Sequence, residues 1–117
     1  MHVTISGRKL RLDDETRDHV ERRLDFALGR FDRRIMGITV RLADVNGPRG
    51  GVDKLCRIDL KMRPTGALMI EERGADVFAA VDTAVRRLGH ALRRELERKK
   101  NRKKGGTRAA GTSGRRR

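Results

Sequence analysis

The chain has 117 residues and is strongly basic, with 30 Lys and Arg against 16 Asp and Glu and a formal net charge of +14. This length suffices for one domain with a small core, and the charge predicts attraction to nucleic acid or anionic lipid that weakens as salt rises. One cysteine excludes an internal disulfide framework, and three Phe without Trp or Tyr argue against RNA-binding domains that stack unpaired bases on aromatic side chains.

The positive charge is concentrated at the C-terminal end. Nine of the cations and none of the acids lie in residues 99–117, so residues 1–98 carry 21 cations against 16 acids. The last residues also lack apolar periodicity. We therefore expect a folded domain over residues 1–98 and a disordered basic tail over residues 99–117. No apolar run is long enough for a signal peptide or a membrane span, so we expect a cytoplasmic protein without a membrane partner.

The beginning of the chain predicts a strand followed by a helix. Residues 2–6 alternate polar and apolar and end at Gly7, as is typical of a strand. Asp13 is a suitable N-cap, and the two acids that follow it lie where the helix dipole favours negative charge. We interpret these three acids as a cap and not as a metal site. Apolar residues then recur at helical spacing to about Arg30.

Three more strands are expected in the middle of the chain. Residues 38–42, 56–62 and 68–72 each alternate between apolar and polar side chains. The glycine-rich loop over residues 46–51 lacks the Gly-Lys-Ser/Thr ending of a phosphate-binding loop and precedes a strand, so it predicts a hairpin connection instead of a nucleotide site. Cys56 takes an apolar position in its strand, and we interpret it as a core residue, not a nucleophile.

Residues 76–98 predict a second amphipathic helix. Asp76 can cap its start, and apolar residues recur on one face at three- and four-residue steps. Turning each residue about 100° from the last places four basic side chains together on one flank of that face. These are Arg87, His90, Arg94 and Arg98. The pattern is typical of a helix that packs on one side and binds a polyanion on the other.

The first helix separates its charges in the same way. Its acids, Asp18, Glu21 and Asp25, fall on one side of the apolar stripe. Its bases fall on the other side; they are His19, Arg22, Arg23 and Arg30. A helix that is basic only for solubility would interleave the two signs. Two helices with one-signed flanks therefore favour a binding surface over solvated faces.

The order strand, helix, strand, strand, strand, helix predicts an α+β fold, βαβββα. The second to fourth strands have short connections and should be antiparallel, whereas the helical crossover allows the first two strands to lie parallel. Both helices should cover one face of this four-stranded mixed sheet, and the other face should remain wet. Glu72 alone is unexplained, because its parity points it toward the helices.

Three stretches resemble one known family. Residues 3–7 precede an acid-capped helix, residues 74–82 (Gly-Ala-Asp-Val-Phe-Ala-Ala-Val-Asp) are similar to a Gly-x-Asp-Met-Tyr-x-Ala-Ile-Asp signature, and the last helix is basic. Over about residues 1–100 the chain resembles the ribosome hibernation promoting factor and ribosome-associated inhibitor family, also called the sigma-54 modulation protein family. Residues 74–82 are the most specific part. The chain resembles the short form, which lacks the second domain that pairs ribosomes in long members.

The resemblance implies a domain related in shape to double-stranded RNA-binding domains. Members lie in the channel of the small ribosomal subunit that messenger RNA and transfer RNA would occupy, where they block initiation and keep idle ribosomes intact. It also implies that Arg23, Arg87, Arg94 and Arg98 contact ribosomal RNA phosphates. His90 stands where the family more often has Arg, which implies a weaker or pH-sensitive contact. Gly29 stands where the family commonly has Lys, beside Arg30.

We weigh four functions. The leading one is a non-enzymatic, monomeric inhibitor that binds the small ribosomal subunit, and the alternative is a general RNA- or DNA-binding accessory protein without a ribosomal site. The expected RNA-binding residues are Arg22, Arg23, Arg30, Arg87, His90, Arg94 and Arg98. An enzyme is disfavoured because no histidine stands at ligand or triad spacing from the acids, so no catalytic residue, metal, cofactor or small-molecule substrate is expected. Direct regulation of a sigma factor ranks low because a basic surface suits RNA better.

Overall fold

The structure is a computed structural model that describes residues 1–45 and 54–109, with side chains through residue 101. The predicted hairpin connection over residues 46–51 lies outside the described residues. Within the described part of the chain, no helix is long and apolar enough to cross a membrane.

The elements follow the predicted order, and the α+β class is confirmed. The strands are β1 (His2–Arg8), β2 (Ile35–Asp44), β3 (Lys54–Met62) and β4 (Ala67–Gly74). The helices are α1 (Asp14–Leu28), the 3-10 helix η1 (Gly29–Arg34) and α2 (Val77–Ala109).

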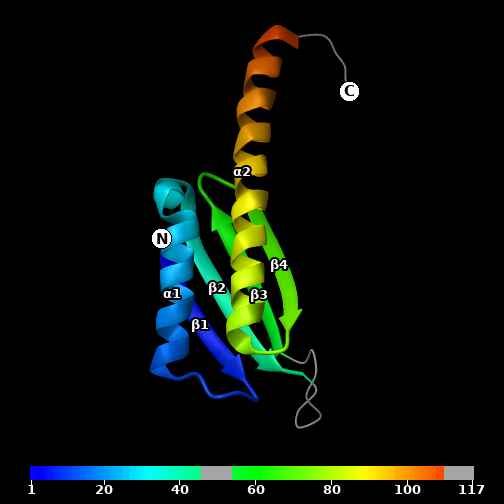
Figure 1. Ribbon diagram of the computed structural model, residues 1–117. Helices are drawn as coiled ribbons and strands as arrows, with labels where there is room; N and C mark the ends of the chain where they lie inside the picture. The colour runs from blue at the N-terminus through cyan, green and yellow to red at the C-terminus, as the bar shows by residue number, and fades with distance from the viewer. Residues whose placement is uncertain (46–53, 110–117) are drawn as a thin grey trace.

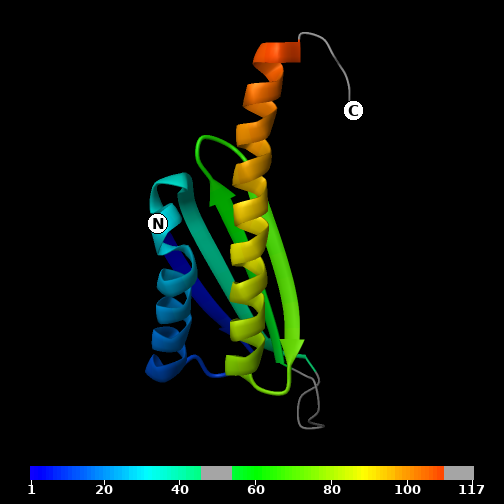
Figure 2. The ribbon, with the colours of Figure 1, turned by 45° about the horizontal axis from the view of Figure 1, so that its top comes forward.

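The four strands form one mixed sheet in the order β1-β2-β3-β4. β1 runs parallel to β2, with Val3 opposite Ile38, and the other two pairings are antiparallel. The helical crossover between β1 and β2 is what permits the parallel pair. Both helices lie side by side on one face of the sheet, as Figure 1 and Figure 2 show. The predicted four-stranded sheet with two helices on one face is therefore confirmed.

The core lies between the helices and the inner face of the sheet. Its apolar residues come from the predicted stripes of both helices and the inward parity of β2 and β3, and fully buried examples are Val20, Leu24, Val40, Ile58, Leu88 and Leu92. Cys56 belongs to this core and is 0% exposed. Burial raises the pKa of its thiol to about 12, so the thiol is protonated and unreactive at neutral pH. Its interpretation as a core residue is confirmed.

Helix α1 begins where predicted and ends slightly earlier. The Asp13 carboxylate accepts a hydrogen bond from the Thr16 backbone N–H at 2.8 Å, and this bond holds the pKa of Asp13 below its usual value. The predicted helix extends to about Arg30, but α1 ends at Leu28 and the chain continues as η1. Inside η1, Phe31 leaves helical geometry with φ −102° and ψ 15°. This departure lets its ring pack against the core before the chain turns into β2.

The second helix is longer than predicted. We expected it to end at Arg98 and residues 99–117 to be disordered, but α2 continues to Ala109. The structure differs from the prediction over residues 99–109. Apolar periodicity stops at Arg98, yet Lys and Arg over residues 99–104 keep a high helix propensity, while Gly105 and Gly106 disfavour a helix. Lys99 also donates a hydrogen bond to the Thr65 carbonyl at 2.6 Å. Figure 1 shows the last turns of α2 extending beyond the sheet; residues 110–117 lie outside the described residues.

Candidate nucleic-acid interface

The position of α2 is set by the turn that precedes it. A Cβ atom on Gly74 would lie 2.9 Å from the Ala80 backbone nitrogen, so only glycine allows this approach of β4 to the helix. The Asp76 carboxylate then accepts a hydrogen bond from the Ala79 backbone N–H at 2.8 Å and caps the helix. Together these two residues determine where α2 starts and which of its faces meets the sheet.

Asp82 links the two helices. Its Oδ1 is hydrogen-bonded to His19 Nε2 at 2.7 Å and lies 3.3 Å from Arg23 Nε. The His19 ring also stacks on Phe78, with the ring centroids 4.0 Å apart and an interplanar angle of 8°. Arg23 Nε is buried and makes no hydrogen bond within the described residues, while 42% of its side chain is exposed. The guanidinium is thus held between the helices with one end open to solvent.

An open groove of about 390 Å³ lies between α1 and α2, and we call it the basic groove. Ala27, Val85 and Gly89 line its floor, and these small side chains let the two helices approach closely. Longer side chains form its walls: Arg23, Phe26 and Arg30 from α1 and η1, and Arg86, His90 and Arg93 from α2. Four guanidinium groups therefore converge on one concavity from two elements.

The cations of the basic groove have few acidic partners. Arg23 faces Asp82, and Arg30 lies over the Phe31 ring with its guanidinium carbon 4.8 Å from the ring centroid. Within the described part of the chain, no ion pair involves Arg86, His90 or Arg93. Cations that converge without acids are stabilised by an external anion, and guanidinium groups bind phosphate oxygens in a bidentate fashion.

Comparison with known families and structures identifies relatives of this fold. Residues 3–100 match the family described as sigma 54 modulation protein / S30EA ribosomal protein. The chain belongs to this family. Comparison with curated protein sequences found no match. The family is that of the ribosome hibernation factors, so the resemblance stated above is confirmed.

Two solved structures resemble the chain. The N-terminal domain of Protein Y from Thermus thermophilus is 30% identical with a TM-score of 0.67, and the match covers 80% of this chain and 98% of that one. A ribosomal subunit interface protein from Coxiella burnetii is 18% identical with a TM-score of 0.72, and the match covers 83% of this chain and 99% of that one. The second likeness shows the fold alone. Both are consistent with the βαβββα arrangement of the hibernation factor family.

The structure explains the family signature over residues 74–82. Gly74 allows the close approach to α2, Asp76 caps the helix, and Asp82 links it to α1. The signature therefore fixes the relative placement of the two helices, which is what creates the basic groove.

The structure divides the predicted site residues into two groups. Arg23, Arg30 and His90 meet in the basic groove as part of one surface. Arg22 lies beside it, in a shallow hollow with Arg23, and pairs with Asp18. The other three, Arg87, Arg94 and Arg98, lie on the opposite flank of α2. Of the expected row of Arg87, His90, Arg94 and Arg98, only His90 lines the basic groove.

The opposite flank of α2 is mostly ion-paired. Arg87 pairs with Glu72 of β4, whose side chain is 17% exposed, and this pair explains the acid at an inward position. Arg98 pairs with Glu95 at 2.9 Å. Arg94 is exposed and has no ion pair within the described residues. Two of the three predicted cations are therefore already partly neutralised by the protein itself.

Sequence reasoning missed Arg86, Arg93 and Phe26. Arg86 and Arg93 stand seven residues apart and so share one face of α2, next to His90. The sequence contains this signal, but it does not indicate which flank of α2 faces α1. Phe26 is 87% exposed. Its position lies off the apolar stripe of α1, so it does not pack in the core.

The side chains that line the groove suit an anion. Within the described residues, no group of three or more His, Cys, Asp or Glu could hold a metal ion. The acids nearest the helix pair serve as caps or ion-pair partners, as Asp13, Asp76 and Asp82 do. The side chains that remain available are guanidinium groups, one imidazole and one phenyl ring.

Proposed function

We propose that this chain is a ribosome hibernation factor that binds the small ribosomal subunit and occupies the channel used by messenger RNA and transfer RNA. It acts in the cytoplasm as a monomer and without catalysis, by occlusion. Family membership supports ribosome association. The observation that supports a specific binding surface is that four guanidinium groups, from α1, η1 and α2, converge in the basic groove. Such an arrangement suits ribosomal RNA phosphates, with specificity from the shape of the channel.

The test is co-sedimentation of the full chain with purified small subunits at about 0.15 M salt, close to physiological ionic strength. We expect saturable one-to-one binding that excludes messenger RNA. Arg93→Gln should weaken binding, whereas Arg73→Gln, an equal loss of charge on the exposed outer face of β4, should leave it unchanged. Equal effects of the two substitutions would contradict the proposed surface.

The extension of α2 beyond the sheet favours a second candidate, a general RNA- or DNA-binding accessory protein. Residues 99–117 hold nine cations and no acid. A chain that ends at Asn101 separates the two functions, because it keeps the hydrogen bond of Lys99 to Thr65 and removes most of these cations. A hibernation factor should retain a defined site after this truncation, whereas a general accessory protein should lose its binding.

A further inference from the structure

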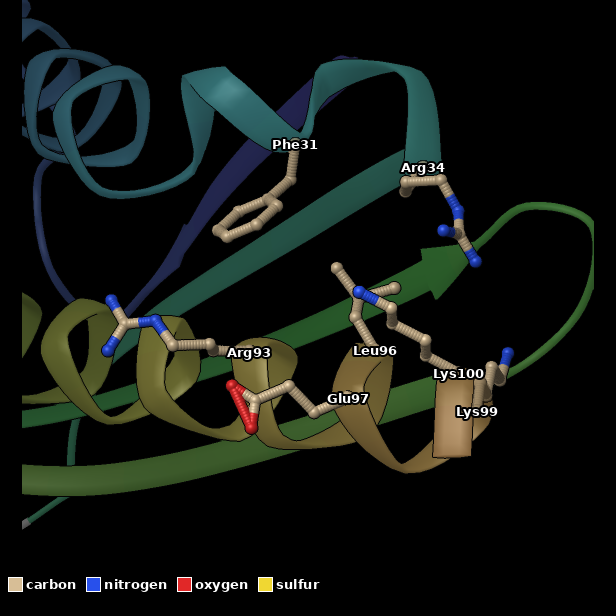
Figure 3. Close-up of a pocket in the computed structure, with 7 residues that line it drawn as sticks. All are labelled: Phe31, Arg34, Arg93, Leu96, Glu97, Lys99 and Lys100. Atoms are coloured by element: carbon tan, nitrogen blue, oxygen red, sulfur yellow. The ribbon is translucent and has the colours of Figure 1, made fainter. Parts of the chain in front are cut away.

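A second cleft lies next to the basic groove, between η1 and α2. Its volume is about 460 Å³, within the range of small-ligand sites. Figure 3 shows Phe31 and Arg34 on the η1 side and Leu96 and Lys100 directed toward them from α2, while Glu97 lies along α2 toward Arg93 at the edge of the cleft. We call this the η1 cleft. Arg93 lines both the η1 cleft and the basic groove, so the two adjoin at this side chain.

The η1 cleft has an apolar part. Phe31 and Leu96 are only partly buried against the core, so each leaves part of its surface facing the cleft. In a protein with three Phe and no Trp or Tyr, an aromatic ring at the edge of a cleft is notable. One face of the Phe31 ring is covered by the Arg30 guanidinium, so a flat object such as a nucleobase would lie on the parts of Phe31 and Leu96 that line the cleft.

The rim of the η1 cleft has the charges expected for a phosphate. Arg34, Arg93, Lys99 and Lys100 stand around it against a single acid, Glu97. Lys99 is already bonded to the Thr65 carbonyl, and Arg34 Nε makes only a long 3.4 Å bond to the Arg63 carbonyl. Lys100 is exposed and makes no ion pair within the described residues. Arg34 and Lys100 are therefore the cations best placed to receive an anion.

Glu97 gives the cleft a means of selecting a base. It makes no ion pair within the part of the chain that the structure describes, and its carboxylate can only accept hydrogen bonds when ionised. Guanine presents two adjacent donors, N1–H and the N2 amino group, to such a carboxylate. Adenine and cytosine present one amino group each, and the O2 and O4 acceptors of uracil repel a carboxylate.

We propose that the η1 cleft binds one guanine nucleoside phosphate. The base lies between Phe31 and Leu96, Glu97 accepts from its N1–H and N2 amino groups, and Arg34 and Lys100 bind the phosphate. This nucleotide is either an unpaired residue of an RNA whose phosphates follow the basic groove or a free nucleotide. The source in RNA rests on the proposed function, whereas binding of a free nucleotide does not.

The first experiment titrates the isolated full chain with GMP, AMP, CMP, UMP and inorganic phosphate and follows the Phe31 ring and Leu96 methyl signals by NMR. We expect saturable shifts with GMP, weaker binding of the other nucleotides, and no saturating shift of the Phe31 ring with inorganic phosphate. Glu97→Gln should remove most of the preference for GMP over AMP. Phe31→Leu, which keeps an apolar side chain, should weaken GMP binding about tenfold, as expected for lost base stacking.

Glu71→Gln on the exposed outer face of β4 is the matched control, because it removes the same charge as Glu97→Gln, and it should change nothing. Melting temperatures of all variants establish that they are folded. Equal binding of GMP and inorganic phosphate, or unchanged GMP binding in both Phe31→Leu and Glu97→Gln, would overturn the proposal.

The second experiment identifies the source of the nucleotide by measuring small-subunit binding of the same variants. If the nucleotide belongs to RNA, Phe31→Leu and Glu97→Gln weaken subunit binding and GMP competes with it. If the nucleotide is free, both variants lose GMP binding but sediment with subunits like the unmodified chain. If the chain binds GMP as proposed but does not bind small subunits, the η1 cleft is supported as a nucleotide site and the proposed function is refuted.

Discussion

The two flanks of α2 carry similar numbers of cations and differ in what those cations contact. On the flank toward α1, Arg86, His90 and Arg93 line the basic groove without ion pairs among the described residues. On the flank toward β4, Arg87 pairs with Glu72 and Arg98 pairs with Glu95. The difference shows that a row of arginines in a sequence does not tell which of them are ion-paired within the protein. That depends on nearby acids, which only the packing of neighbouring elements reveals.

The outer face of the sheet extends this comparison. Arg41 and Arg57 both bond to Asp59, at 3.1 and 3.0 Å. The hydrogen bond and the negative charge of Asp59 raise the pKa of the Arg57 guanidinium. This face is therefore wet and charged, as predicted, yet its charges largely satisfy one another.

The strongest test of the comparison removes two arginines from each flank. Arg86→Gln with Arg93→Gln should weaken small-subunit binding by at least about tenfold and lower the slope of log affinity against log salt by roughly 1.5 units, since each lost phosphate contact removes about 0.7–0.9. Arg87→Gln with Arg98→Gln should have a much smaller effect on affinity. Sedimentation at several salt concentrations measures both quantities, and equal losses from the two flanks would contradict the distinction.

The next largest effect concerns the turn that orients both flanks. Gly74→Ala brings a Cβ atom to 2.9 Å from the Ala80 backbone nitrogen, so the start of α2 must shift. We expect a loss of about 1–3 kcal/mol in the free energy of unfolding, measured by urea denaturation. Gly29→Ala is the matched control, because no atom lies within 4 Å of its added Cβ and its φ of −55° is helical. It should leave stability unchanged or raise it slightly.

A smaller effect separates an ion-paired cation from an unpaired one on the same flank of α2. Arg87→Gln leaves the largely buried Glu72 carboxylate without its partner and should cost about 1 kcal/mol of stability with little loss of RNA affinity. Arg94→Gln removes an exposed cation without an ion pair in the described chain and should not alter stability. Thermal unfolding of the two variants measures this difference; equal stability would show that the Glu72 pair contributes nothing.

The smallest effect tests the start of α1, away from both flanks. The pKa of Asp13 is lowered by its hydrogen bonds to Thr16, so its contribution to stability is present above the ordinary value of 3.8 and is lost as pH falls through the lower folded value. Asp13→Asn keeps a capping side chain without a titrating group. At pH values below about 4, the melting temperature of the unmodified chain should therefore decrease relative to that of Asp13→Asn. Affinity for small subunits at neutral pH should be the same for both.

The fold could be predicted from the sequence because the patterns that indicate its strands and helices are local. The alternation of residues 56–62, the Asp13 cap and the apolar stripe of α2 each depend on neighbours a few positions away. The limits of these signals explain the errors. The helix beyond Arg98 was missed because no apolar stripe continues there, and the end of α1 was misplaced because Leu28 leaves helical geometry, with φ −123° and ψ −5°, before the chain continues as η1.

The candidate site was only partly accessible. Arg23, Arg30 and His90 were predicted and meet in the basic groove, while Arg86, Arg93 and the exposed Phe26 were not singled out. A helical projection places Arg86 and Arg87 about 100° apart on α2, yet it does not say that one faces α1 and the other Glu72. That distinction depends on which sides of α2 lie against α1 and β4.

Periodicity, capping residues and charge counts were enough to establish an α+β domain with a basic helical side, because each is a property of short stretches of chain. They were also enough to indicate a polyanion as the partner. Which cations remain unpaired, the role of Glu72, the link through Asp82 and the existence of the η1 cleft depend on residues far apart in sequence. Ion pairing and concavity are properties of distances in space, so they followed only from the packing of α1, η1, β4 and α2 around one core.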